Sequence, residues 1–219
     1  MLADLSHEVV DGMTTYPGIP APRLRVVVAR ETSVTRLRGG ASFEIEEVAL
    51  VGNTGTYVDA PYHYYPDRAD VAGLALERLV NVPIVVVRSV DRRSVTAAAL
   101  GDPDLLRGRA VLLHTGWDRH WGTDRYLDTD CSHLTADAVA LLVRAGAAVV
   151  GIDSLNIDDP TDLRRPAHAG LLGAEIPIIE HLTNLGAVPD TGACLTALPA
   201  PVRGMASFPV RAVATWHDD

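Results

Sequence analysis

Short apolar runs, separated by polar, Gly- and Pro-containing stretches, recur along most of the chain. Residues 82–87 and 110–114 are nearly continuous apolar sequence, which predicts strands buried on both faces. Looser apolar patterns predict four more strands, over residues 24–30, 41–51, 147–152 and 210–214. The chain is therefore expected to build a sheet whose central strands are covered on both sides.

Helices are predicted between some of these strands. Residues 135–145 give the strongest signal, because Thr135 can cap the helix, Ala and Leu fill it, and Gly146 ends it. Shorter helical segments are expected over residues 71–79 and 94–100. A helix followed by a strand that ends in polar residues is typical of α/β proteins. We expect a single α/β domain over residues 1–219, with a central mixed sheet.

Composition narrows the classes of partner. The chain is 47% hydrophobic, carries a net charge of −9 and has no basic run, which argues against nucleic acid and against an anionic membrane surface. No apolar stretch approaches the roughly 20 residues that span a bilayer. Cys131 and Cys194 lie far apart, so reduced thiols are expected. These features together favour a cytoplasmic protein.

Residues 51–65 are the stretch most suggestive of chemistry, and we expect a site there rather than a strand. Glycines relax this backbone, Pro61 stiffens it, and four polar side chains follow at short intervals: Asn53, Tyr57, Asp59 and His63. A carboxylate and an imidazole four residues apart can converge on a divalent cation. Alternatively, Asp59 caps a turn and His63 is an ordinary polar residue.

Two aromatic segments have open interpretations. The Gly- and Pro-rich loop over residues 11–22 contains Tyr16, which could line a pocket or pack onto the core. Trp117 and Trp121 follow the predicted strand 110–114, close to Arg119 and His120. They could form one wall of a pocket for an aromatic substrate, or act as core anchors.

The stretch at residues 53–63 resembles the fingerprint of the cyclase family of metal-dependent hydrolases, which includes bacterial kynurenine formamidases and isatin hydrolases. That fingerprint reads His-x-Gly-Thr-His-x-Asp-x-Pro-x-His. Five of its positions match, at Gly55, Thr56, Asp59, Pro61 and His63, whereas Asn53 and Tyr57 replace the first two histidines. Other segments are similar in family order, so the resemblance covers essentially the whole chain: residues 4–7, 13–18, 114–117, 151–154 and 165–180.

The resemblance implies a swivelling β/β/α domain and a set of metal ligands. One site of the dinuclear members would need the histidines that Asn53 and Tyr57 replace. The ligands of the other site match four residues here, namely Asp59, His63, His168 and Glu180. The resemblance therefore implies one divalent metal ion, with Zn²⁺ favoured by two nitrogen and two oxygen ligands and Mn²⁺ as the alternative.

The same resemblance implies hydrolysis of a small amide, formamide or lactam by a metal-activated water, with an N-formylkynurenine-like aryl formamide as the default substrate. Tyr57 could stabilise the oxyanion, Asn53 could orient the substrate, and His181 could shuttle protons. The two missing histidines leave alternatives open: a cyclase, dehydratase or isomerase that uses Tyr57 and Asp59 as acid and base, or a non-catalytic binder of a small molecule. Family members imply a homodimer or homotetramer.

Overall fold

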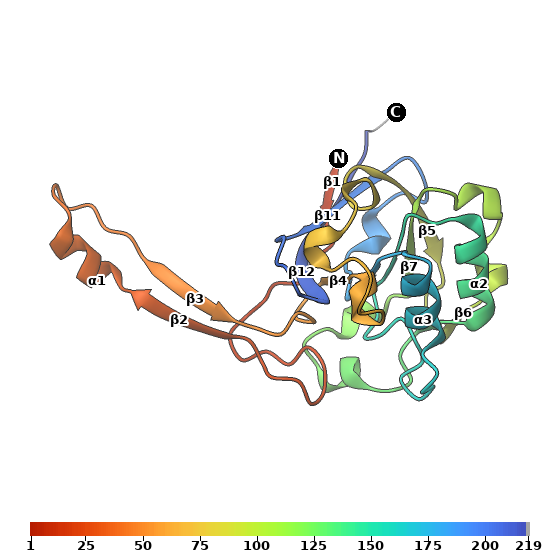
Figure 1. Cartoon of the computed structure of the whole chain (residues 1–219), viewed down its shortest axis with the longest axis horizontal. Helices are drawn as coiled ribbons and strands as arrows, with labels where there is room; N and C mark the ends of the chain where they lie inside the picture. Colours follow the sequence, from red (N-terminus) through yellow and green to blue (C-terminus); the bar gives the residue numbers. More distant parts are fainter. Residues whose placement is uncertain (218–219) are drawn as a thin grey trace.

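An eight-stranded sheet forms the centre of the protein (Figure 1). The structure is a computed structural model, and it describes residues 1–217. The strand order is β1-β12-β11-β5-β7-β9-β10-β4, and β12 also pairs with β4, so the sheet curls into a closed, barrel-like arrangement. The strands are β1 (Leu2–Asp4), β4 (Tyr57–Asp59), β5 (Val82–Arg88), β7 (Ala110–His114), β9 (Val149–Ile152), β10 (Ile178–Glu180), β11 (Cys194–Pro199) and β12 (Ser207–Thr215).

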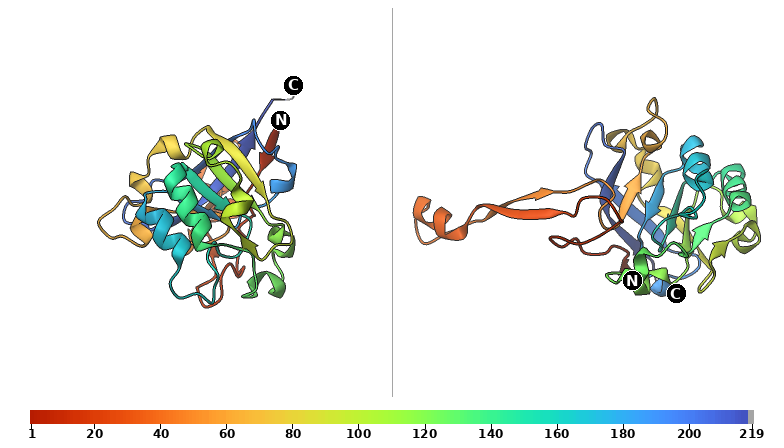
Figure 2. Two further views of the ribbon diagram at one scale, coloured as in Figure 1. Left: turned by 90° about the vertical axis from the view of Figure 1, so that its right-hand side faces the viewer. Right: turned by 90° about the horizontal axis from the view of Figure 1, so that it is seen from below.

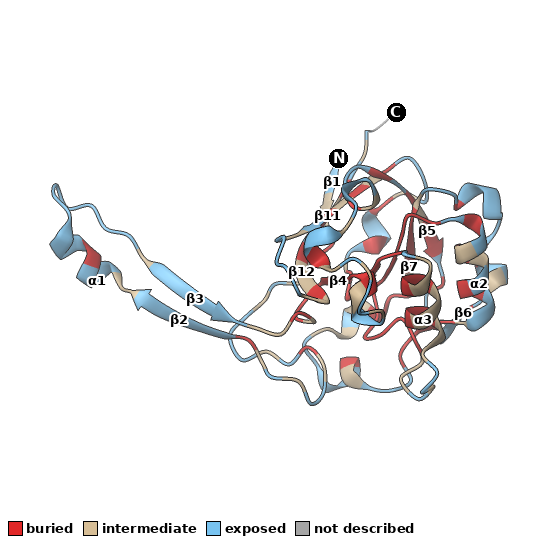
Figure 3. Cartoon of the chain, in the orientation of Figure 1, coloured by how far each residue is buried: buried red, intermediate tan, exposed pale blue. Residues whose placement is uncertain are grey.

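The parallel part of this sheet runs through β5, β7, β9 and β10, and the other strands join it antiparallel. Alternate residues of β7 belong to two different cores: Leu112 packs into one, while Val111 and Leu113 pack into the other. The second core lies under the helices α2 (Ala136–Ala145) and α3 (Pro166–Gly173), and Figure 3 shows the buried residues concentrated there and in the central strands. The predicted mixed α/β fold with a central sheet is thus confirmed.

The helix predicted over residues 135–145 is α2. It ends at Gly146, whose left-handed backbone (φ 76°) lets its N–H reach the carbonyl oxygens of Leu142 and Val143. Thr135 stands at the N-terminal cap, but its side chain makes no capping hydrogen bond; its hydroxyl lies within hydrogen-bond distance of Asp137 Oδ1 and of the carbonyl of Val95 instead. The start of the helix was therefore predicted correctly, while the capping contact was not.

Several other predictions need correction. Residues 71–79 form two 3₁₀ turns rather than one helix, and residues 94–100 begin as strand β6 (Ser94–Val95), which pairs with β8 (His133–Leu134). Strand β11 was not predicted, and β12 starts at Ser207, before the predicted strand 210–214. The 3₁₀ turns are η1 (Val34–Arg36), η2 (Pro61–His63), η3 (Val71–Gly73), η4 (Leu76–Arg78), η5 (Ala97–Leu100), η6 (Pro103–Leu105), η7 (Trp117–His120), η8 (Asp124–Leu127) and η9 (Leu185–Ala187).

An arm made of β2 (Arg23–Val28), α1 (Arg30–Ser33) and β3 (Ile45–Ala49) projects from the body (Figures 1 and 2). Both of its strands were predicted. Their apolar side chains nevertheless stay in solvent, as for Leu24 (47% exposed), Val26 (53%) and Val48 (56%). No helix within residues 1–217 is long and apolar enough to cross a membrane.

Candidate metal and active site

Strand β4 and the turn after it place the central stretch of the sequence. β4 lies between β10 and β12, and the register sets Tyr57 opposite Glu180 and Asp59 opposite Ser207. Residues 51–65 were expected to form a site rather than a strand. The structure corrects this, because three of them form strand β4, and two of these, Tyr57 and Asp59, carry side chains of the site. After Pro61, the turn η2 brings His63 back toward Asp59.

Helix α3 supplies His168, and Asp158 fixes its position. One carboxylate oxygen of Asp158 accepts the backbone N–H of Ala167 at 2.6 Å, and the other accepts that of His168 at 3.0 Å. The second oxygen also lies 2.6 Å from Nδ1 of the His168 ring. Asp158 therefore caps the first turn of the helix and orients the imidazole at once, which leaves Nε2 facing Asp59.

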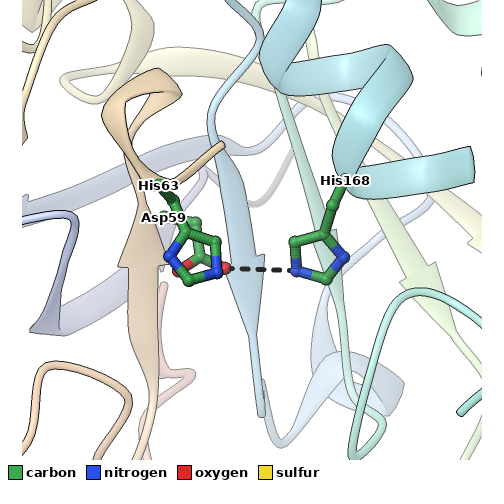
Figure 4. Close-up of side chains that lie close together, drawn as sticks. All are labelled: Asp59, His63 and His168. Carbon is green, nitrogen blue, oxygen red and sulfur yellow. Dashed lines mark ion pairs between the residues drawn. The ribbon is translucent and has the colours of Figure 1, made fainter. Parts of the chain in front are cut away.

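Asp59, His63 and His168 converge on one point (Figure 4), and each offers one ligand atom within 4.8 Å of the others. Nε2 of His168 is 3.6 Å from Oδ2 of Asp59. That oxygen is buried and has no hydrogen-bond partner among residues 1–217. Because an unpaired buried carboxylate oxygen is costly, its position beside two imidazoles fits a bound cation.

Electrostatics support the same interpretation. Burial disfavours a charged His168, yet its hydrogen bond to Asp158 and the nearby carboxylates of Asp59 and Glu180 raise its pKa to about 10. Burial works against the charged form of Asp59 as well, but the neighbouring imidazoles of His168 and His63 hold its pKa below its usual value. A buried site with three acidic side chains therefore attracts positive charge, which a proton supplies when no metal ion is present.

Glu180 lies beside this group of three but is not one of the residues that converge on the common point. Its Oε1 is 3.9 Å from Nε2 of His168 and accepts the backbone N–H of Ile157 at 2.6 Å. Its Oε2 accepts the hydroxyl of Tyr57. Burial and the charge of Asp59 raise the pKa of Glu180 to about 7, against the opposing effect of His168.

Asn53 and Tyr57 form hydrogen bonds to the acidic groups of the site. The amide of Asn53 donates to Oδ1 of Asp59 at 3.4 Å and to Oγ of Ser207 at 3.3 Å, and the Ser207 hydroxyl also donates to Asp59. Burial and the charges of Glu180 and Asp59 raise the pKa of Tyr57 well above 10. The phenol is therefore neutral at physiological pH and acts as a donor.

His181 is placed differently from the other candidate residues. It is fully buried, its backbone is left-handed (φ 58°), and neither ring nitrogen has a hydrogen-bond partner in the described part of the chain. Its ring packs against those of Tyr57, Trp121 and Tyr126. Burial and the nearby His7 lower its pKa to about 3, so the imidazole is neutral.

A cavity of about 260 Å³ opens onto the site. Tyr16 lies in its wall, so the loop over residues 11–22 does reach a pocket. Trp117 and Trp121 are not among the lining residues: Trp117 is a core residue whose indole donates to the carbonyl of Tyr126, and Trp121 lines another cavity. The lining residues are Tyr16, Ile19, Asn53, Tyr57, His63, Tyr64, Asn156, Arg165, His168 and Glu180.

Sequence reasoning missed Asp158 and Ser207 as contributors to the site. Asp158 acts across a loop on residues 167 and 168, and Ser207 acts through pairing of β12 with β4, so no local spacing marks either residue. Asp153 accepts the backbone N–H groups of Thr115 and Gly116, which joins two segments that the family resemblance had singled out.

Comparisons with known proteins bear on the family and the fold. The chain is 30% identical to a kynurenine formamidase of Salinibacter ruber, over 97% of this chain and 96% of the relative. Its fold is similar to that of an isatin hydrolase bound to the product analogue thioisatinate, with a TM-score of 0.83 and 20% identity over 97% of this chain and 91% of the other.

A second solved structure, described as a predicted metal-dependent hydrolase from Bacillus stearothermophilus, gives a TM-score of 0.76 at 21% identity, over 98% of this chain and 97% of the other. These likenesses confirm the expected fold. The family profile described as "Putative cyclase" matches residues 3–159. The match covers well over half of the chain, and the protein belongs to the cyclase family.

Proposed function

We propose that this protein is a metal-dependent hydrolase of small aryl amides, with an N-formylkynurenine-like aryl formamide as the first substrate to test. The observation that carries the proposal is the unpartnered, buried Oδ2 of Asp59, which faces His63 and His168 beside an open cavity. Support also comes from the relative named kynurenine formamidase and from the similarity to an isatin hydrolase.

Asp59, His63 and His168 would hold a single divalent ion, with Glu180 as the fourth ligand. Nitrogen and carboxylate donors together favour Zn²⁺, with Mn²⁺ as the alternative. When bound, such an ion polarises a carbonyl group and lowers the pKa of a water molecule toward about 7. Asp158 contributes by orienting His168 and by keeping a proton on its Nδ1, which leaves Nε2 available.

The chain's own groups would position the substrate and stabilise charge. Tyr57 keeps its proton because its pKa is raised, so its hydroxyl, which donates to Glu180 in this structure, could donate to a developing oxyanion instead. The amide of Asn53 lines the same cavity and could orient a substrate carbonyl. His181 was expected as a proton shuttle. We propose instead that it supports the ring of Tyr57, because it is neutral and lies outside the cavity lining.

A second candidate function rests on the hydrogen bond between Tyr57 and Glu180. This pair joins a neutral phenol to a carboxyl group whose pKa is raised to about 7, an arrangement suited to acid–base catalysis. A cyclase, dehydratase or isomerase could use it without hydrolysis. A non-catalytic binder would need neither turnover nor a raised pKa.

The decisive experiment combines metal analysis with turnover. Protein purified without chelator or histidine tag is analysed for metal per subunit and assayed on N-formylkynurenine, simple aryl formamides and isatin. About one Zn²⁺ or Mn²⁺ per subunit with hydrolysis is expected. Metal-free protein that stays inactive after Zn²⁺ and Mn²⁺ are supplied would contradict the proposal.

Two variants assign the residues. Asp59→Ala should lose the metal and the activity, because the unpartnered carboxylate oxygen disappears. Tyr57→Phe should keep the metal and lower kcat about 100-fold, the effect typical of losing one oxyanion donor. Stoichiometric metal in Asp59→Ala would show that the ligands lie elsewhere.

We also propose that the protein is a homo-oligomer in which the arm packs against a second copy. A two-stranded ribbon is marginally stable alone, and Leu24 and Val48 pair across this one with 47% and 56% of their surface exposed. Light scattering of Leu24→Asp/Val48→Asp should give a smaller particle than wild type. Leu163→Asp, at a body position that is 91% exposed, is the control. A monomeric wild type would contradict this proposal.

A further inference from the structure

Arg165 is the only Arg or Lys among the residues that line the cavity beside the candidate metal ligands. Its side chain donates a hydrogen bond from Nη1 to Oδ1 of Asn156 at 3.0 Å. Within residues 1–217, no carboxylate forms an ion pair with it, whereas its neighbour Arg164 pairs with Asp162 on the surface. This half-buried guanidinium lies near the hydroxyl of Tyr16 and the carboxylate of Asp158, and its hydrogen bond to a neutral amide leaves most of its N–H donors available for an anion.

The backbone places this side chain close to the reacting end of the cavity. Arg165 has a left-handed conformation (φ 47°, ψ 56°), which residues with a Cβ rarely adopt, and it directly precedes helix α3. His168 lies one turn further along the same helix. The backbone of Arg165 and the proposed metal ligand His168 therefore lie within one turn of each other at the start of α3, which keeps the guanidinium on the same side of the cavity as the ligand.

The remaining walls suit a planar ring. The ring of Tyr64 stacks on that of His168 with a centroid distance of 5.3 Å and an interplanar angle of 17°, and Tyr16 and Ile19 also line the cavity. A volume of about 260 Å³ is small for a ligand site, so the occupant is a compact molecule such as a single substituted ring. The cavity is thus lined by aromatic side chains that could contact a planar ring, and the guanidinium of Arg165 is also part of its lining.

We propose that Arg165 binds a carboxylate on the substrate, so that the enzyme selects acidic aryl amides over neutral ones. This inference rests on the proposed hydrolase function and adds the substrate class and the residue that selects it. Arginine suits this role because its planar fork matches the two oxygens of a carboxylate, which the point charge of a lysine does not.

Matched substrates test the proposal. 2-Formamidobenzoate carries the carboxylate, and 2-formamidobenzamide is its neutral counterpart. Wild-type enzyme, purified with its metal, should prefer the acid by about 10-fold to 100-fold in kcat/KM, the range expected for hydrogen bonds to a charged group. Arg165→Gln should remove this preference by raising KM for the acid alone. Arg164→Gln is the control and should behave as wild type.

Two results would overturn the assignment. Wild-type enzyme could hydrolyse both compounds equally well, or Arg165→Gln could lower kcat/KM for both by the same factor. The second result would mean that Arg165 acts by supporting Asn156, whose Oδ1 also accepts the backbone N–H of Asp158.

Calorimetry separates this proposal from the hydrolase function, because binding needs no turnover. The probes are 2-aminobenzoate and 2-aminobenzamide. One outcome is that neither formamide is hydrolysed, that wild type still binds the acid more tightly than the amide, and that Arg165→Gln loses this difference. This outcome would support the anion site and contradict the hydrolase function. The opposite outcome is hydrolysis with no preference for the acid over the amide in either turnover or binding. It would support the hydrolase function and contradict the role of Arg165.

Discussion

Replacing Asp158 by Asn tests whether one buried carboxylate organises the site. The side chain keeps its shape but loses its charge, and one of its two acceptor oxygens becomes a donor. In the native protein those oxygens accept two backbone N–H groups of helix α3 and contact the ring of His168. Breaking a buried, hydrogen-bonded charge pair costs about 3–5 kcal/mol, so we expect the free energy of unfolding to fall by that amount.

Urea unfolding of the metal-free protein, followed by tryptophan fluorescence, measures this loss. Metal titration of the folded variant should show affinity weakened about 10-fold to 100-fold, because His168 loses the partner that fixes its ring. Asp162→Asn is the matched control, since Asp162 pairs with Arg164 on the surface and should leave both quantities near wild type. If both variants unfold at the same urea concentration and bind metal equally, Asp158 does not organise the site.

The remaining predictions concern pH and packing. Burial lowers the pKa of His7 from 6.5 to about 4, so the folded state favours the neutral ring. The contribution of this ring to the free energy of unfolding is therefore complete above pH 6.5 and is lost as the pH falls toward 4. His7→Phe keeps the stacking on Trp121 without titrating, so its urea midpoint should fall less than that of wild type over this range, and an equal fall would refute the assignment. Gly151→Ala would bring a Cβ within 2.6 Å of Leu182 Cδ1 and 2.9 Å of Leu112 Cδ2. Thermal unfolding should show a loss of about 1–3 kcal/mol, and Gly186→Ala, with only ordinary contact at 3.5 Å, should cost much less; equal losses would contradict the packing argument.

Much of the fold was predictable because its strongest signals are local. The strand over residues 110–114 and the helix over residues 135–145 follow from apolar runs and from a glycine that ends the helix. Strand β11 lacks such a signal, since apolar residues occupy exposed positions such as Leu198 as well as buried ones, and the short strand ends in Pro199. Residues 71–79 have helical spacing but form two 3₁₀ turns, because spacing does not show where hydrogen bonding stops.

Local patterns and the resemblance at residues 53–63 were enough to predict the fold class and the family, and they named the candidate metal ligands. Which side chains meet depends on the tertiary structure. The pairing of β4 with β10 and β12 sets Tyr57 against Glu180, and a loop contact carries Asp158 to His168. The exposure of the arm also depends on the tertiary structure. Its strands have the apolar sequence of core strands, but no core lies beside them, so Leu24 and Val48 stay exposed. Contacts between distant segments depend on strand register and chain reversal, which no short stretch of sequence encodes.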